Sequence, residues 1–377
     1  MTPLVSVILP SFNHERFVAE AISSVLSQSY GNLELIIVDD ASQDGSPAII
    51  QGCSDPRIRS FLLTENVGGA AALNAGVREA TGAFVAICNS DDIWEPGKLE
   101  QQVAIMEAQP GLGACFSDVS WIDEGGEPLD TDQAALLQTF TESNRSRQQW
   151  MKRLIERGNR LCHSSALVRR QAYTRLGPYC DWLRQVPDLH MWLRLLAQYE
   201  IFVSPERLVR FRWHSGNTSA PTPPVVRRAA NEMSLVLKQF FEAISPADFV
   251  EAFGTGTPLP DSARASFRLE QARYLMDATG PQGNMLRQLG WEFFFDVVGS
   301  LPWSEQLDRA DILAPSQFQS RLAQTCVWTA PPPPPSPPQL EPPVPERAVS
   351  GPPVSEITTL ELVRTIGRRL MSRRSRQ

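Results

Sequence analysis

The fold of this chain is constrained most by a regular alternation of two patterns between residues 4 and 116. Short runs of apolar and β-branched residues indicate buried strands. The runs are 4–9, 33–38, 58–63, 83–88 and 112–116. Between them lie segments whose apolar residues have helical spacing, among them 15–28, 68–80 and 97–108. Strands that alternate with helices predict an α/β fold with a mostly parallel sheet covered by helices on both faces.

Two pairs of adjacent carboxylates follow two of these runs. Asp39-Asp40 ends the second run, and Asp91-Asp92 follows the fourth. Ligand sites in open α/β sheets lie outside the carboxyl ends of the strands, so we expect both pairs at one crevice. Carboxylates combined with substrate phosphates are typical ligands of a hard divalent cation. Each pair is also compatible with a solvated turn or a helix cap.

Composition narrows the class of protein and its compartment. The chain has 377 residues and a net charge of −7, which argues against a general nucleic-acid binder. Its six cysteines form no C-x-x-C pair, so we expect a reducing, cytoplasmic compartment and no structural zinc. The segment after Met1 lacks the basic and apolar regions of a signal peptide. No apolar run approaches the roughly 20 residues of a membrane span.

The rest of the sequence predicts a helical region and a tail. Prolines at 221–224 mark the end of a first domain, 1–220, and helical patterns fill 221–330. Prolines dominate 331–354, which predicts a disordered, extended linker. Residues 355–377 combine helical apolar spacing with an excess of arginine, which predicts a basic amphipathic helix. Such a helix suits an anionic membrane surface or a partner groove, or it is a frayed, solvated end.

Four motifs, in order, carry a resemblance to a known family. They are Val5 to Asn13, the turn Asp39 to Ser46, the stretch Asn66 to Gly76, and Asn89 to Asp92. Together they resemble the inverting, nucleotide-sugar-dependent glycosyltransferases of family 2, which have the GT-A fold, a Rossmann-like arrangement. The resemblance covers residues 1–220. It implies a glycosyltransferase of hexosyltransferase type that acts in glycan biosynthesis.

The resemblance assigns the nucleotide sugar to the loops that follow the strands. In the family, the loop after the first strand seats the nucleotide, and the second acidic residue after the second strand binds the base, typically uracil. The positions that match the nucleotide-binding motifs are Pro10, Ser11, Asn13, Asp40, Asn66, Gly68 and Ser90. A carboxylate that accepts a ring N–H confers base selectivity, because a buried acceptor without its donor is costly. The expected donor is therefore a UDP-sugar.

The family's D-x-D motif binds a divalent metal on the diphosphate. Here Asn89 stands where the first Asp is usual, Asp91 matches the main metal ligand, and Asp92 follows it. His214, in the segment that closes the domain, is a further candidate for contact with the metal or the diphosphate. A lone His is more often structural. The site lacks one negative charge, and the choice between Mg²⁺ and Mn²⁺ stays open.

The family's catalytic base is an acidic residue at the start of a helix. Pro187 to Leu195 match this motif, with Pro187 where Glu is frequent, and Asp188 is the candidate base. In a single displacement this base removes the proton of the acceptor hydroxyl as the oxygen attacks the anomeric carbon. An Asp at this position is also a good helix cap, and the two roles are compatible.

The resemblance further implies transfer of one sugar per acceptor. Val209 stands at the Gln position of the processive synthases' Q-x-x-R-W motif, whose last two residues are present as Arg212 and Trp213. The expected acceptor is a glycan or a lipid-linked intermediate. The basic tail suggests peripheral contact with the inner face of the cell membrane. The alternative is a catalytically weakened binding or scaffold module, which the unusual Asn89 and Pro187 favour.

Overall fold

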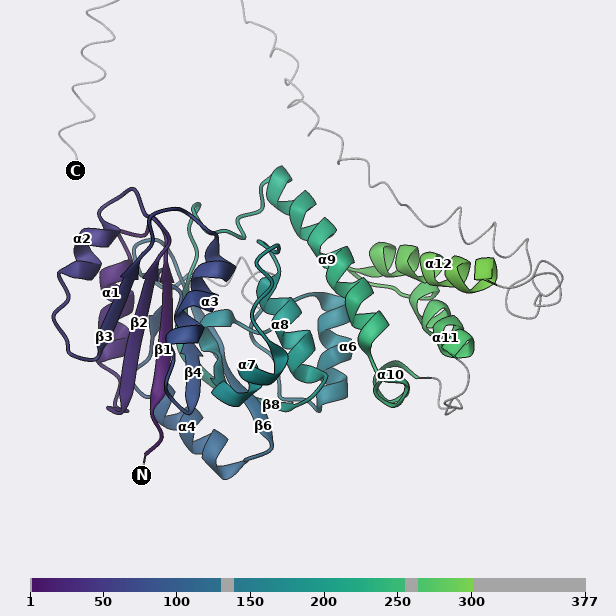
Figure 1. Ribbon diagram of the computed structural model, residues 1–377, viewed down its shortest axis with the longest axis horizontal. Helices are drawn as coiled ribbons and strands as arrows, with labels where there is room; N and C mark the ends of the chain where they lie inside the picture. The colour runs from purple at the N-terminus through teal and green to yellow at the C-terminus, as the bar shows by residue number, and fades with distance from the viewer. Residues whose placement is uncertain (1, 130–138, 255–263, 301–377) are drawn as a thin grey trace, which may run out of the picture. The chain divides into compact units, whose positions relative to one another are not determined.

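The computed structural model describes residues 2–129, 139–254 and 264–300, which all belong to one compact unit (Figure 1). The predicted linker 331–354 and the predicted amphipathic helix 355–377 lie outside the described residues, as does the end of the predicted helical region. Within the described ranges, no helix has the length and apolar character needed to cross a membrane.

One sheet of eight strands lies at the centre of the described part of the chain, and its first half is parallel. Strands β3, β2, β1 and β4 lie side by side in this order, each parallel to its neighbours. Their bounds are β1 Val5–Ser11, β2 Leu33–Asp39, β3 Ile58–Leu62 and β4 Phe84–Ile87. The apolar runs of the sequence therefore predict this half of the sheet closely.

The second half of the sheet is mixed, and the sequence predicts it only in part. The order continues β4-β7-β6-β8-β5; β7 is antiparallel to both neighbours, β8 is parallel to β6, and β5 is antiparallel to β8. The bounds are β5 Ile93–Trp94, β6 Leu112–Ile122, β7 Leu167–Arg169 and β8 Glu200–Arg212. Strand β6 is longer than the predicted run 112–116, because it continues through the polar Ser117 and Asp118, where its register against β8 shifts.

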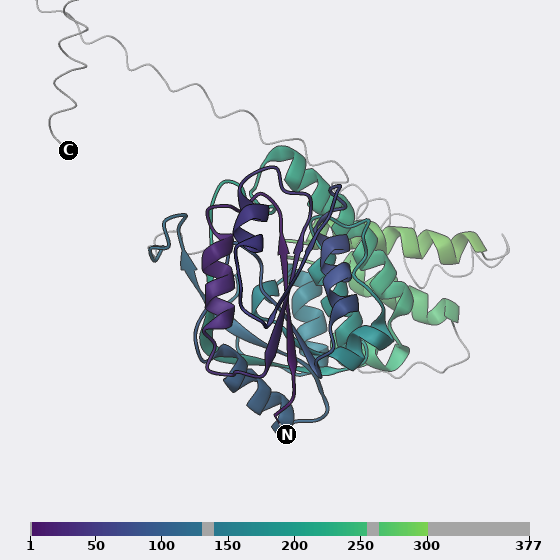
Figure 2. The same ribbon diagram turned by 60° about the vertical axis from the view of Figure 1, so that its left-hand side comes forward.

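Helices cover both faces of the sheet, as the sequence predicts. Val5 and Leu9 of β1 lie in one apolar cluster and Ile8 in the other, so both faces must be covered. Helices α1 and α4 pack on the first face, and α3, α6 and α8 on the second; Figure 2 shows α1 and α3 on opposite sides of β1. The helix bounds are α1 Val18–Leu26, α2 Ser46–Gln51, α3 Gly69–Glu79, α4 Lys98–Ala108, α6 Arg147–Arg157, α7 Arg170–Leu176 and α8 Pro187–Leu196.

Helices also fill the described part of the predicted helical region, and they extend the core of the second face. Helix α9 contacts α8, α10 contacts α6, and α12 contacts α9. Their bounds are α9 Pro223–Ala243, α10 Pro246–Phe253, α11 Arg264–Met276 and α12 Gly283–Ser300. Phe240 and Phe241 of α9 pack on Phe249 and Phe253 of α10, with ring centroids 5.5–6.4 Å apart within this group. A domain boundary at residue 220 stays a prediction.

A substitution at Gly76 tests how tightly α3 packs on the sheet. A Cβ atom at Gly76 would lie 2.4 Å from Cγ2 of Ile8 and 3.4 Å from Cγ2 of Val38, both fully buried. We expect Gly76→Ala to lower the free energy of unfolding by about 1–2 kcal/mol, because overpacking outweighs the gain in helix propensity. Urea unfolding followed by circular dichroism measures the change. Gly69→Ala is the matched control, since nothing lies within 4 Å of its Cβ position; an equal loss there would contradict this account.

Candidate active site

The candidate site lies at the edge of the sheet where β1, β2 and β4 end. The loops after β1 and β2 are joined by hydrogen bonds. The N–H of Asp40 donates to the carbonyl of Ser11 over 2.8 Å, and the N–H of Gln43 donates to Oδ1 of Asn13 over 2.8 Å. Asn13 has a φ of +53°, a left-handed conformation that asparagine tolerates. Asn13, which the sequence predicts as a nucleotide contact, therefore joins the loop after β1 to the loop after β2 in this structure.

The two carboxylates at the end of β2 have different surroundings. Asp39 accepts hydrogen bonds from the N–H and the hydroxyl of Ser42, at 2.9 and 2.7 Å, and so closes the turn. Asp40 accepts hydrogen bonds from the N–H groups of Val67 and Gly68, at 2.7 and 2.9 Å. An ionised carboxylate has about four acceptor sites, so Asp40 retains capacity for an N–H of a ligand.

Most of the other predicted nucleotide contacts lie around Asp40. The Asn66 amide donates to the carbonyl of Asp40 at 3.1 Å, and Gly68 has a φ of +91°, which glycine adopts without strain. Pro10 and Ser11 end β1, and the buried Ser11 hydroxyl has no hydrogen-bond partner within the described ranges. The structure brings these residues together at one edge, and their contact with a nucleotide stays a prediction.

Asp91, His214 and His14 form a compact cluster at the end of β4. Their possible ligand atoms lie within 4.8 Å of one another. Nε2 of His214 is 3.2 Å from Oδ2 of Asp91, and Nδ1 of His14 is 2.7 Å from the hydroxyl of Ser90. Burial alone would raise the pKa of Asp91, but the hydrogen bond from His214 and the nearby His14 outweigh it and lower this pKa. A carboxylate with two imidazoles is a suitable ligand set for a divalent metal ion.

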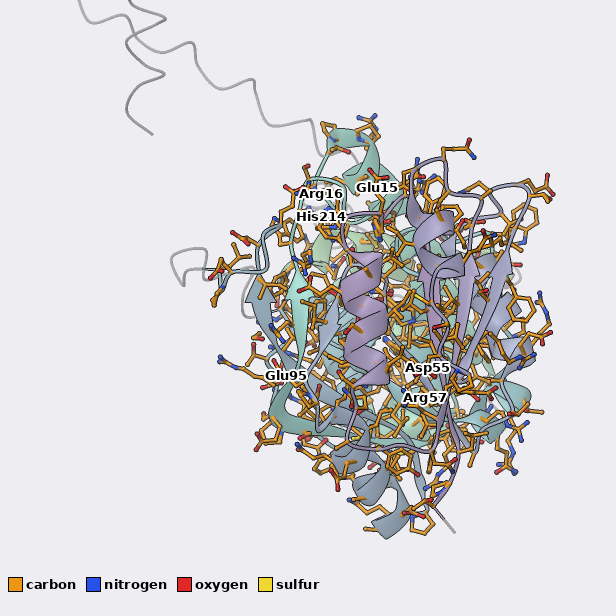
Figure 3. All side chains as sticks on the ribbon, turned by 90° about the vertical axis from the view of Figure 1, so that its left-hand side faces the viewer. Glu15, Arg16, Asp55, Arg57, Glu95 and His214 are labelled. Carbon is orange, nitrogen blue, oxygen red and sulfur yellow. The ribbon has the colours of Figure 1, made fainter. Side chains whose placement is uncertain are left out.

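The sequence predicts Asp91 and His214 as site residues, but it does not predict His14. This residue lies in the polar loop after β1, where a single histidine carries no recognisable motif. Its ring centroid lies 5.7 Å from that of His214, although the two residues are far apart in the chain. Figure 3 shows His214 at the same end of the molecule as Glu15 and Arg16 of that loop. Only the fold brings the two histidines together.

The structure does not bring Asp92 into this cluster, although the sequence suggests it as a metal ligand. Its Oδ1 accepts the N–H of Arg212 at 3.0 Å, and its Oδ2 accepts the hydroxyl of Ser164 and the amide of Asn89. Burial, followed by the charge of Asp91, raises the pKa of Asp92 to about 8. Asp92 is thus buried and hydrogen-bonded within the fold, while Asp91 faces the two histidines; a role for Asp92 as a metal ligand stays a prediction.

Arg212 fixes the turn after β4 against the rest of the fold. Its side chain is buried, and its Nε donates to the carbonyl of Asp91 at 2.9 Å. Nη1 donates to the carbonyls of Asp123 and Glu124, at 3.2 and 3.1 Å, and Nη2 donates to the carboxylate of Glu20 on α1 at 2.5 Å. The planar guanidinium can serve all these acceptors at once, which a lysine cannot.

Asp188 is the second residue of α8 and is half-buried. Its carboxylate accepts hydrogen bonds from the amide of Asn159 at 2.6 Å and from the N–H of Leu189 at 2.8 Å. Burial raises the pKa of Asp188 to about 6, and these hydrogen bonds only partly oppose the shift. The N-cap position is Val186, so Asp188 does not cap this helix. A carboxylate with this pKa is ionised at neutral pH and is basic enough to accept a proton.

The loop before Asp188 is held by a helix from the predicted helical region. The buried carboxylate of Glu232 on α9 accepts the N–H groups of Arg184, Gln185 and Val186 over 2.6–3.2 Å. An anion that accepts several backbone N–H groups strongly restricts their conformation. Helix α9 therefore takes part in placing Asp188, which no pattern in the sequence indicates.

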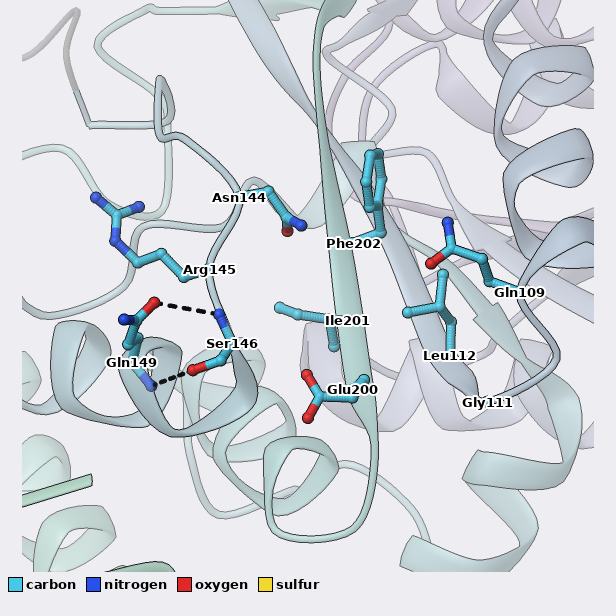
Figure 4. Close-up of a pocket in the computed structure, with 10 residues that line it drawn as sticks. All are labelled: Gln109, Gly111, Leu112, Asn144, Arg145, Ser146, Gln149, Glu200, Ile201 and Phe202. Carbon is cyan, nitrogen blue, oxygen red and sulfur yellow. Dashed lines mark hydrogen bonds between the residues drawn. The ribbon is translucent and has the colours of Figure 1, made fainter. Parts of the chain in front are cut away.

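A hollow of about 600 Å³ lies at the opposite edge of the sheet, where β6 and β8 begin (Figure 4). Several of its polar groups already serve the fold. Ser146 and Gln149 form the capping box of α6, and Oδ1 of Asn144 accepts the N–H of Val203 at 3.0 Å. The candidate active site is therefore the group of residues around Asp40 and Asp91 at the other edge.

Comparisons with known proteins agree with this geometry. A family model described as glycosyl transferase family 2 matches residues 6–177. The Bacillus subtilis (strain 168) glycosyltransferase EpsE is 30% identical over 257 residues, which are 65% of this chain and 88% of that protein. TuaG of the same organism, named as a teichuronic acid biosynthesis glycosyltransferase, is 42% identical over 130 residues, or 34% of this chain; the match spans about half of TuaG, 51%.

A solved structure is similar in fold. The crystal structure of S. aureus TarS 1-349 in complex with UDP-GlcNAc superposes with a TM-score of 0.50 at 16% sequence identity. The match covers 78% of this chain and 88% of that chain. At this identity the likeness concerns the fold, a sheet with helices on both faces followed by helices.

A substitution of Arg212 tests how far the stability of the fold around the site depends on one buried guanidinium. We expect Arg212→Met to lower the free energy of unfolding by on the order of 3 kcal/mol, because three carbonyl groups and Glu20 lose their donor. Urea unfolding measures the loss. The matched control is Arg210→Met on the same strand, whose partly exposed ion pair with Glu95 contributes about 1 kcal/mol or less. Similar losses for the two variants would show that the Arg212 network does not hold the turn.

Proposed function

The chain belongs to glycosyl transferase family 2, and we propose that it transfers one sugar, with inversion, from a nucleotide diphosphate sugar to a hydroxyl group of a glycan or lipid-linked acceptor. One observation carries the proposal. One segment, residues 159–164, connects Asp91 and its two histidines to Asp188, whose pKa is raised. Asn159 bonds to Asp188, and Ser164 bonds to Asp92, the neighbour of Asp91.

The donor fits the edge where β1 and β2 end. The acceptor capacity left on Asp40 suits the ring N–H of uracil, and the backbone of Gly68 offers close approach. The S. aureus TarS structure carries UDP-GlcNAc, which supports a UDP-sugar as the first donor to try. The positive φ of Gly68 keeps this loop open to a ligand without a side chain in the way.

The residues at the end of β4 fit a divalent metal ion. Oδ2 of Asp91 accepts hydrogen bonds from His214 and Asn217, while Oδ1 has no partner within the described ranges and is free to act as a ligand. When bound, the metal would neutralise charge on the diphosphate leaving group. Two imidazoles favour Mn²⁺ over Mg²⁺, because Mg²⁺ is usually bound through oxygen ligands. His14, Asp91 and His214 are the residues that would hold it.

Asp188 supplies the base of the reaction. Its ionised carboxylate accepts the proton of the acceptor hydroxyl as that oxygen bonds to the anomeric carbon, and the bond from this carbon to the diphosphate breaks. The Asn159 amide orients the carboxylate and favours its charged form. Attack opposite to the leaving group inverts the anomeric configuration. The proton then rests on Asp188, whose pKa of about 6 allows its release to solvent.

The non-catalytic alternative is not favoured. A scaffold has no need for Asp188 with a raised pKa, nor for Asp91 and two histidines within ligand distance of one another. The absence of the Gln from the Q-x-x-R-W pattern supports transfer of a single sugar. Arg212, the Arg of that pattern, is fully engaged inside the fold.

Nucleotide binding tests the donor site. We expect UDP to bind more tightly than GDP in calorimetric titrations with Mn²⁺, and to bind weakly with Mg²⁺ or a chelator. Asp91→Ala should abolish the metal dependence, and His14→Ala should weaken Mn²⁺ binding, because each removes a ligand. Asp92→Asn is not a control, since it disturbs the fold. Folded protein that binds no nucleotide, or binds UDP equally without metal, would overturn this donor site.

Asp188 gives a separate test of the chemistry. Asp188→Asn should lower the rate of sugar transfer by roughly 10²–10⁴-fold and leave the Kd of UDP unchanged. Because only the ionised carboxylate is active, the wild-type rate should fall about tenfold per pH unit below about pH 6. Asn159→Ala removes a donor that stabilises the charge, so the acid limb should move to higher pH. A rate of wild-type magnitude in Asp188→Asn would exclude Asp188 as the base.

A further inference from the structure

Residues 158–165 connect the two halves of the site. Asn159 donates to Asp188 over 2.6 Å, and at the other end the hydroxyl of Ser164 donates to Asp92 and accepts the N–H of Asn89 at 3.0 Å. Ser164 lies in a short 3-10 helix, His163–Ser165. Each side chain on this segment is therefore within a few residues of Asn159, which bonds to Asp188, or of Ser164, which bonds to the turn that carries Asp91.

Arg160 follows Asn159 on this segment and is the unusual residue. It is half-buried, and its Nε atom is inaccessible to solvent and has no hydrogen-bond partner. A buried N–H without an acceptor is destabilising. The terminal Nη groups of this half-buried side chain are the donors that an incoming ligand could reach.

The charges around Arg160 also favour the binding of an anion. Burial, and after it the charges of Arg153 and Arg157 on α6, lower the pKa of Arg160, while Glu142 opposes the shift. Glu142 is itself neutralised by ion pairs with Arg153 and Arg145, at 2.5 and 3.0 Å. Positive charge is thus in excess here, in a chain whose net charge is −7.

Resting on the proposed function, we propose that Arg160 and Arg157 bind a phosphate group of the acceptor, so that the acceptor is a phosphate-bearing glycan. A guanidinium donates two parallel hydrogen bonds to a phosphate, which both holds and orients it. Arg160 is adjacent to Asn159, the partner of Asp188, so a phosphate held there would present the acceptor to the base. The donor's diphosphate is expected at the other end of the segment, with Asp91.

Two probes that differ only in charge test this proposal. One is N-acetylglucosamine linked to a decyl chain through a diphosphate, and the other is the neutral decyl N-acetylglucosaminide. Each is titrated into full-length protein saturated with UDP and Mn²⁺, so that the donor's phosphate site is already filled. We expect the charged probe to bind at least about tenfold more tightly, because hydrogen bonds between ionised groups are strong. The preference should weaken as salt is added.

Variants of single arginines show which side chains cause the preference for the charged probe. Arg160→Gln should reduce it to about threefold or less and leave the Kd of UDP unchanged. Arg157→Gln, at an exposed position where the fold is not at risk, should reduce it in part. Arg78→Gln, an exposed arginine of α3, is the matched control and should leave it intact.

Three results would overturn the phosphate site: equal binding of the two probes to wild type, a preference that survives in Arg160→Gln, or a loss of UDP affinity in Arg160→Gln. The last result would assign Arg160 to the donor's diphosphate. Wild-type protein that fails to bind UDP with metal would instead reject the proposed function itself, so the two failures are distinguishable.

Discussion

The structure depends on the buried guanidinium of Arg212. It joins the end of β8 to the turn after β4, to α1 and to the loop after β6, which are elements from all parts of the first 212 residues. Its backbone N–H also bonds to Asp92. A buried cation is tolerated only when its charge and its N–H groups are satisfied, so these elements must meet in one arrangement. The position of Asp91 follows from that requirement.

In each pair of adjacent aspartates one carboxylate supports the backbone and the other is open to a ligand. Asp39 closes its own turn, while Asp40 keeps acceptor capacity. Asp92 is enclosed, while Asp91 faces two histidines. Successive residues at a strand end point in different directions, so a pair of aspartates can serve both purposes.

The sequence predicts those parts of the molecule that depend on local pattern. The parallel strands, the acidic pairs at their ends and Asp188 at the start of α8 all follow from apolar spacing or from short motifs. His14, Asn159 and Glu232 do not, because their roles arise from contacts between distant segments that no spacing records. The predicted length of β6 is too short for a related reason: the polar Ser117 and Asp118 interrupt the apolar pattern at the point where the register against β8 shifts.

The hydrogen bonds between Glu232 and the loop before Asp188 have a consequence for how such proteins diversify. The family model ends at residue 177, before Asp188, and Glu232 lies further on, in helix α9 of the C-terminal helical region. Yet three backbone N–H groups just before Asp188, the proposed base, donate to that one carboxylate. Exchanging the C-terminal helices between relatives would therefore not be neutral. A recombinant chain would inherit the proposed base without the helix that positions its loop, so we expect the two segments to be inherited together.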